Sequence, residues 1–526
     1  MAPADVILVN ARGHTMDSLR PLVEAVAIRG NRIEAVGLAS DVERLRGSAT
    51  RVIDCEGRVL VPGFIDAHIH LFAYAANLVS LDCSPRAVRS VADIQRVLAQ
   101  AATAKPSGSW LRGWGYNEFY LAEHRHPTRH DLDRAAPHHP VKLTHRSGHA
   151  WVLNALAMQR LGITSETPEP PGAVIERDAS GELTGYFMEM EDDLSARGVP
   201  TLPEVELDEG LRLAMQSLLS KGITSIHEAS PYGASAHWDR LAAMQKRGAL
   251  PLRIYKMFGP GDFDALRSRD LFFGATQERL SVGAIKFMLN ETSAQMLPDR
   301  DALGEQVYTA HRAGYQVAFH ATTEAGVIAA ADAVDAALRR SLDDARDIAA
   351  LGLRLQDHRH RIEHCGVCPS TLAVRLHSLG IVVVTQPGFI AEHGERWLAE
   401  VSPEHQPRLY PVGALRRAGV RVAFGSDCPV APADPFAALA AAVTRRAASG
   451  ALVGQEHAVS VAEALAMHTS AGAYAASDEH DRGSIAVGKL ADLVLLDRDL
   501  LVVSPEELRE TRVVWTMVGG ETVWEG

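Results

Sequence analysis

The chain has 526 residues, of which 47% are hydrophobic, so it is long enough to bury the cores of two or three domains. Its 53 lysine and arginine residues and 65 acidic residues give a formal charge of −12, which disfavours nucleic acid or an anionic membrane as a partner. No apolar run reaches the roughly 18 residues of a membrane span, and the first residues lack signal-peptide features, so we expect a cytoplasmic protein. The five cysteines lack the spacing of a disulfide framework, which suits a reducing compartment.

Both ends of the chain predict short β-strands joined by tight turns. These strands are expected at residues 6–9, 23–29, 32–36 and 51–61 and at residues 491–497, 512–518 and 521–524. Gly30-Asn31 between two alternating runs is typical of a two-residue hairpin, whose turn needs positive φ. Neither group of strands can bury a core alone, so we expect residues 1–61 and 484–526 to pair into one composite β-sandwich.

Between the two ends, short apolar strands alternate with helix-length segments. Eight such strands are expected, at residues 60–70, 223–227, 252–258, 282–288, 316–320, 361–364, 381–385 and 420–424. This alternation predicts an α/β fold, a TIM-like (β/α)8 barrel over residues 62–83 and 206–483. The long separation between the first two strands indicates an inserted domain at 84–205, which we expect to roof the active site.

The first barrel strand ends in two histidines separated by one residue, His68 and His70. Because side chains alternate along a strand, both imidazoles project from one face and can hold one metal ion. Four more candidates stand at or just past the carboxyl ends of later strands: Lys286, His320, His364 and Asp427. Imidazoles and carboxylates are donors that zinc, manganese or iron accept, and barrel enzymes place their chemistry at this end. These six residues are the candidate metal ligands.

Motifs spaced over nearly the whole chain carry a family resemblance. They are residues 62–70 (PGFIDAHIH), 149–154 (HAWVLN), 361–365 (RIEHC), 386–387 (QP), 424–429 (FGSDCP) and 483–494 (GSIAVGKLADLV). Together with the strand-end histidines and Lys286, they resemble the amidohydrolase superfamily, metal-dependent hydrolases on a (β/α)8 barrel with a β-sandwich made from both termini. The resemblance is closer still to amidohydrolase family 3, the branch that includes N-substituted formamide deformylases.

The resemblance implies a divalent metal cofactor, preferably zinc, with one or two ions per chain. The implied ligands are His68, His70 and Asp427 for one ion and His320 and His364 for a second. Lys286 would bridge both ions after reacting with carbon dioxide, because a carbamate is a bidentate anion whereas a protonated amine repels cations. The alternative for Lys286 is an ordinary snorkelling or salt-bridged lysine.

Two departures from the pattern of this branch lie close to the implied bridging lysine. The branch often has Asp-Gly where this chain has Asn290-Glu291, and Gly-Asp shortly after the fifth-strand histidine where this chain has Thr322-Thr323-Glu324. We therefore expect the pocket near the fourth and fifth strands to be remodelled.

The implied ligands suggest a hydrolytic mechanism. A bound metal lowers the pKa of its water towards 7 and polarises a carbonyl, and Asp427 is the expected general base that returns a proton to the leaving amine. Four further residues are candidates for holding substrate, with ordinary packing or hydrogen bonding as the alternative for each: Tyr116, Asn117, His149 and Gln386.

The expected function is hydrolysis of a C–N bond in an amide, formamide or N-acyl amine, with a small molecule as substrate. Hydrolysis of a carbamate, urea or lactone, or deamination of a ring, uses the same barrel and is the alternative chemistry. The full ligand set argues against a non-catalytic scaffold. Formation of a homo-oligomer stays open.

Overall fold

The computed structural model describes residues 2–289, 296, 298–343 and 357–526 of the chain. These residues form two compact units. One comprises the described parts of Met1–His70, Met215–Leu289 and Pro298–Gly526, and the other comprises Leu71–Ala214. Among the helices that are described, none has the length and apolarity needed to cross a membrane. The pair Asn290-Glu291, where the sequence predicts a remodelled pocket, lies outside the described residues.

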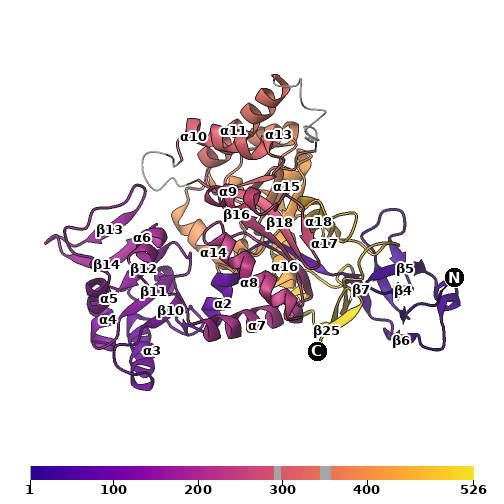
Figure 1. The fold of residues 1–526 in the computed structure, drawn as a ribbon, viewed down its shortest axis with the longest axis horizontal. Coiled ribbons are helices and arrows are strands. Elements are labelled where there is room, and N and C mark those ends of the chain that lie inside the picture. Colours follow the sequence, from indigo (N-terminus) through magenta and orange to yellow (C-terminus); the bar gives the residue numbers. More distant parts are fainter. Residues whose placement is uncertain (1, 290–295, 297, 344–356) are drawn as a thin grey trace. The chain divides into compact units, whose positions relative to one another are not determined.

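The first unit contains eight parallel strands that neighbour one another in the order β8, β15, β16, β18, β19, β20, β21 and β22. Of these strands, β16 and β18 are labelled in Figure 1. Their bounds are Phe64–Ile69 (β8), Ile223–Glu228 (β15), Arg253–Phe258 (β16), Leu280–Met288 (β18), Val317–Ala321 (β19), Arg361–His364 (β20), Val382–Thr385 (β21) and Val422–Phe424 (β22). The segment after β22 returns to β8: the Asp427 amide donates to the His68 carbonyl at 2.7 Å, and the His70 amide donates to the Cys428 carbonyl at 2.9 Å. These bonds join the two edge strands, and the predicted TIM-like barrel is confirmed.

The barrel strands are buried on both faces, as expected for parallel strands enclosed by helices. Every residue of β15, β16, β20 and β21 is buried. Helices follow the strands, among them α8 (Ala234–Lys246), α10 (Arg300–Arg312), α11 (Glu324–Asp343), α13 (Ser370–Ser378), α14 (Gly388–Glu400), α15 (Val412–Arg417), α16 (Pro435–Thr444) and α17 (Val461–Met467). Glycine is required at Gly425, because a Cβ there would lie 2.5 Å from the backbone nitrogen of His68. This close approach lets the chain after β22 meet β8.

Strands from both ends of the chain share one sheet, in the order β25, β24, β23, β7, β2, β3, while a second sheet has the order β5, β4, β1, β6. Their bounds are Val6–Val9 (β1), Arg12–His14 (β2), Leu22–Val23 (β3), Ala25–Arg29 (β4), Arg32–Gly37 (β5), Arg51–Asp54 (β6), Val59–Pro62 (β7), Leu493–Leu496 (β23), Val513–Val518 (β24) and Glu521–Glu525 (β25). One hydrophobic core takes Leu8 and Ile28 from the smaller sheet and Leu60, Leu495 and Trp515 from the larger one. Segments from the two ends of the chain are therefore stabilised together.

The single strand predicted over residues 60–70 is wrong, because the structure divides this segment into β7 and β8. β7 pairs with β2 and β23, whereas β8 joins the barrel. The division falls at Gly63, whose amide donates to the Asp492 carbonyl at 2.9 Å and where a Cβ would lie 2.1 Å from Thr224 Oγ1. As a result His70 is the first residue beyond the barrel strand rather than part of it.

The second unit has a sheet of its own, in the order β13, β14, β12, β11, β10, β9. Its strands are Leu81–Asp82 (β9), Leu111–Tyr116 (β10), Val141–His145 (β11), Ala150–Leu153 (β12), Val174–Arg177 (β13) and Leu183–Met188 (β14), and its helices include Val91–Ala104 (α3) and Arg129–Ala135 (α4). Ile94 and Leu98 of α3 share a core with Leu111, Leu143 and Val152 of the sheet. The antiparallel pairing of β13 with β14 forms a hairpin.

Candidate metal centre

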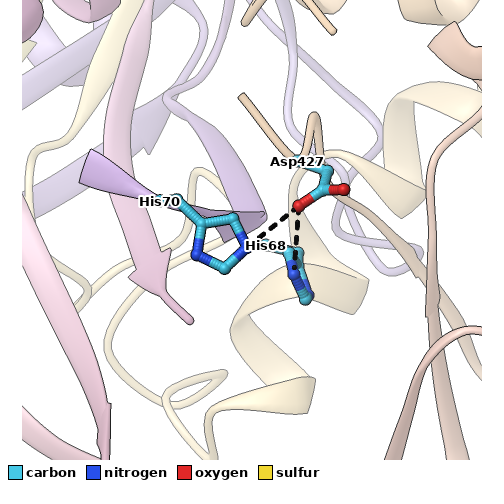
Figure 2. A group of neighbouring side chains, drawn as sticks. All are labelled: His68, His70 and Asp427. Carbon is cyan, nitrogen blue, oxygen red and sulfur yellow. Dashed lines mark ion pairs between the residues drawn. The ribbon is translucent and has the colours of Figure 1, made fainter. Parts of the chain in front are cut away.

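Three of the predicted ligands come together at the rim of the barrel: His68 near the end of β8, His70 just beyond it, and Asp427 in the loop after β22. Asp427 Oδ1 lies 3.3 Å from His68 Nε2 and 3.1 Å from His70 Nε2 (Figure 2). One donor atom from each residue lies within 4.8 Å of the other two, and no second group of three such donors is found among the described residues.

Hydrogen bonds on the far side of each ring determine which nitrogen faces this centre. His68 Nδ1 bonds to a Glu363 carboxylate oxygen, and His70 Nδ1 lies 2.9 Å from Ser230 Oγ, whose own hydroxyl donates to Glu228 Oε1 at 2.6 Å. Both imidazoles therefore carry their proton on Nδ1, which leaves a lone pair on each Nε2.

The fit of a cation to this centre can be tested on Asp427. Its Oδ1 atom is buried and has no hydrogen-bond partner among the described residues, although the Nε2 atoms of His68 and His70 are close. Asp427 Oδ1 and the two Nε2 atoms present lone pairs to one another with no proton between them, so they repel unless a cation lies among them. These three metal ligands therefore fit a divalent metal.

A buried network holds His68 in place. Arg361 donates to Glu363 from Nε at 2.5 Å and to the Ala67 carbonyl at 2.6 Å, and the side chains of Glu363, Arg361 and His68 are fully buried. Burial raises the pKa of Glu363, yet the positive charge of Arg361 outweighs it and the pKa stays below its usual range. Glu363 is therefore a charged acceptor for His68, and its oxygens are occupied.

His320 and His364 form a second pair of candidate metal ligands, and their rings face each other. His364 Nε2 lies 3.0 Å from His320 Nδ1, and His364 Nδ1 lies 2.9 Å from Gln386 Oε1. Burial lowers the pKa of His364 to about 3, so the ring is neutral at physiological pH. Since the amide oxygen of Gln386 can only accept, the His364 proton is on Nδ1 and the Nε2 lone pair is directed at His320.

Lys286, on β18, lies beside His68. Its Nζ atom lies 3.3 Å from His68 Nε2, and the side chain is buried. Burial lowers the pKa of Lys286 to about 8. Burial therefore weakens the preference of this lysine for the charged form without abolishing it. The structure brings all six predicted ligands to the same end of the barrel strands.

The four candidate substrate residues lie in different surroundings. Gln386 contacts His364, as described above, whereas the other three belong to the second unit. Tyr116 is fully buried there, with its hydroxyl 3.0 Å from His126 Nδ1, and Asn117 accepts a hydrogen bond from the Phe119 amide at 3.2 Å. His149 is partly exposed and pairs with Glu189 at 3.1 Å. The substrate-binding role of all four stays a prediction.

Sequence reasoning missed the side chains that support the ligands. Arg361, Glu228, Ser230 and Lys256 are polar residues on or beside barrel strands in which every residue is buried. Charged residues are rarely buried without a partner, so such residues within apolar strands are a usable signal of a buried network. Glu363, inside the 361–365 motif, belongs to the same network through its bonds to Arg361 and His68.

The eight-stranded barrel and its rim of imidazole and carboxylate donors define a (β/α)8-barrel protein with a candidate metal centre. The family model described as Amidohydrolase family matches residues 51–524. An N-substituted formamide deformylase from Arthrobacter pascens is 31% identical and aligns over 99% of this chain and 98% of its own length. The chain belongs to the amidohydrolase family, a family of hydrolases, and the resemblance seen in the sequence is confirmed.

Two solved structures share the fold. An uncharacterized metal-dependent hydrolase from Pyrococcus horikoshii OT3 has a TM-score of 0.74 and 23% identity, covering 95% of this chain and 99% of its own. Another uncharacterized metal-dependent hydrolase, from Pyrococcus furiosus, has a TM-score of 0.71 and 24% identity, covering 94% of this chain and 99% of its own. At these identities the two neighbours support the fold.

Proposed function

We propose that the protein is a metal-dependent hydrolase that cleaves the C–N bond of an amide, formamide or N-acyl amine in a small molecule. The observation that carries the proposal is the buried Asp427 Oδ1, which has no hydrogen bond among the described residues and faces two imidazole lone pairs. The relative that is named as an N-substituted formamide deformylase supports the choice of bond, because the alignment covers 99% of this chain. The two barrel neighbours named as metal-dependent hydrolases support the need for a metal.

In this proposal His68, His70 and Asp427 hold one divalent ion, with zinc preferred, and His320 with His364 holds a second. Zinc suits these donors because it accepts neutral imidazole and carboxylate in a site that keeps an open position. A metal bound there supplies a more acidic water and polarises the scissile carbonyl. Lys286, once carboxylated, would add carbamate oxygens to these five ligands.

Asp427 carries out both proton transfers, and Glu363 holds its neighbours in position. Asp427 accepts the proton of the attacking water, because its carboxylate is charged and lies beside both ligand imidazoles. The same carboxyl group then returns the proton to the leaving nitrogen, which would otherwise depart as an unstable amide anion. Glu363 stays ionised and bonded to Arg361 and His68 throughout, so it holds geometry while Asp427 exchanges the proton.

The position of Lys286 favours amide hydrolysis with two ions over the alternative of ring deamination with one. Its Nζ atom lies 3.3 Å from His68 Nε2, and the ring centroids of His68 and His364 are 4.9 Å apart, so a carbamate there would lie near one residue of each group. Carbamate, urea and lactone hydrolysis would use the same groups and are therefore included in the test.

The proposal is tested by measuring metal content and hydrolysis on one preparation. Purified protein is loaded with zinc, its metal is quantified by atomic emission, and it is assayed with matched N-formyl, N-acyl, carbamate and lactone compounds. We expect about two ions per chain and fastest turnover of an N-formyl or N-acyl amine, with one of the two ions and the turnover lost in His68→Ala. Turnover that is unchanged after complete removal of metal would refute the metal mechanism, and turnover of the lactone alone would refute the C–N assignment.

A further inference from the structure

A series of polar side chains in contact with one another connects His70 to the interior of the barrel wall. His70 Nδ1 lies 2.9 Å from Ser230 Oγ, and Ser230 Oγ lies 2.6 Å from Glu228 Oε1. Glu228 is the last residue of β15, and its other oxygen lies 2.6 Å from Lys256 Nζ on the neighbouring strand β16. The side chains of Glu228 and Lys256 are fully buried, so water does not compete for these contacts.

The direction of each hydrogen bond follows from Lys256, the last residue of this series. Lys256 Nζ donates to the carbonyls of Ser230 and Met257 at 2.7 Å each and forms an ion pair with a Glu228 oxygen at 2.6 Å. Lys256 is therefore satisfied as a cation, and Glu228 is its counter-ion. Because a carboxylate can only accept, the Ser230 hydroxyl donates to Glu228, and the Ser230 oxygen accepts the Nδ1 proton of His70.

We propose that Ser230, Glu228 and Lys256 are positioning residues that hold His70 with its Nε2 lone pair directed at the metal. The inference rests on the proposed function, since it concerns a ligand of the same metal centre. Ser230 fixes the tautomer and the ring orientation of His70, Glu228 fixes the direction of the Ser230 hydroxyl, and Lys256 keeps Glu228 ionised. Partners of this kind typically change metal affinity or activity by about 10- to 100-fold when they are removed.

This relay makes the two imidazoles of one metal unequal. His68 bonds directly to the carboxylate of Glu363, whereas a hydroxyl separates His70 from the carboxylate of Glu228. A direct carboxylate draws the imidazole proton more strongly and raises the basicity of the ligand nitrogen. His70 is therefore the weaker donor of the pair, and its binding depends more on how the ring is held.

A purely structural role for the buried ion pair is the competing explanation, because Glu228 and Lys256 also connect β15 to β16. The test therefore uses the hydroxyl of Ser230, which lies between the ion pair and the ligand. Ser230→Ala removes the relay and leaves the ion pair, while Ser230→Thr keeps a hydroxyl at the same position. Ser281→Ala is the matched control: Ser281 is a buried barrel serine whose hydroxyl donates to the Ile254 carbonyl at 3.4 Å, away from the ligands.

Each full-length variant is depleted of metal and titrated with zinc against a chromophoric chelator, and a second sample is loaded with cobalt(II) for its visible absorption spectrum. We expect Ser230→Ala to weaken zinc binding by about 10- to 100-fold and to shift the cobalt bands, and Ser230→Thr to restore both to near the parent values. Ser281→Ala should match the parent.

The outcomes separate the inference from the function on which it rests. If Ser230→Ala binds zinc like the parent and shows the same cobalt spectrum, the relay is overturned even though the metal centre stands. If Ser230→Thr and Ser230→Ala are equally impaired, the hydroxyl is not the connecting group and the inference also fails. A parent protein that binds neither zinc nor cobalt would instead refute the proposed function.

Discussion

Glu363→Gln replaces the carboxylate behind His68 by an amide of the same shape, and the structure predicts that neither orientation of the amide can satisfy its neighbours. One oxygen of Glu363 accepts from Arg361 Nε, and the other accepts from His68 Nδ1 and from a second Arg361 nitrogen. An amide presents one oxygen and one NH2 group, so an N–H must face either the guanidinium or the imidazole proton. If it faces His68, the ring moves its proton to Nε2 and loses the lone pair that binds metal.

Two costs follow from this geometry. Arg361 is fully buried and loses its counter-ion, and breaking a buried pair in this way costs about 3 to 5 kcal/mol of stability. Loss of the charged partner of a ligand imidazole lowers metal affinity by about 10- to 100-fold, which corresponds to about 1.4 to 2.8 kcal/mol.

Calorimetry on metal-depleted protein measures the first cost, and zinc competition with a chelator measures the second. Glu324→Gln is the control, because Glu324 pairs with Arg408 at 3.4 Å with both side chains about 40% exposed, and such a surface pair contributes at most about 1 kcal/mol. Zinc affinity of Glu363→Gln within threefold of the parent would refute the tautomer argument.

Three further perturbations have distinct expected results. Asp427→Asn should keep much of its metal and lose turnover by about 10²- to 10⁴-fold, because an amide cannot accept the proton; an unchanged rate would assign the base elsewhere. His320→Ala should lose one ion of two and His68→Ala the other, as measured by atomic emission; loss of both ions in either variant would show one shared site. His468 packs against Phe424, and burial lowers its pKa to about 4 from 6.5. Because the folded protein holds this imidazole neutral, the stability that the group contributes is complete above pH 6.5 and is lost as the pH falls to about 4. Over this range the free energy of unfolding of His468→Leu should fall by about 3 kcal/mol less than that of the parent, measured by unfolding of metal-depleted protein. A pH profile identical to that of the parent would contradict this.

The sequence predicted the barrel well because each strand is apolar on both faces and the ligands follow the strand ends. It did not predict the side chains that hold the ligands, because those contacts depend on which strands neighbour one another. Ser230 and His70 are 160 positions apart, and β15 brings them within 2.9 Å only because it pairs with β8. The missed strands of the second unit have a local cause. Gly113 on β10 weakens the strand pattern, yet the packing requires it, because a Cβ there would lie 2.8 Å from Leu143 Cδ1.

Two buried lysines on neighbouring strands show how contacts decide what the same residue type can do. Lys256 on β16 donates to two carbonyls and forms an ion pair with a carboxylate, and these contacts favour its charged form. Lys286 on β18 has one hydrogen-bond contact among the described residues, with His68 Nε2. With its pKa lowered to about 8 by burial, roughly a tenth of Lys286 is a neutral amine at pH 7. Only a neutral amine attacks carbon dioxide, with loss of a proton, and the carbamate that results would supply negative charge to bound cations. Of the two lysines, Lys286 is therefore the one whose surroundings suit the proposed carboxylation, whereas Lys256 pairs with Glu228 inside the barrel wall.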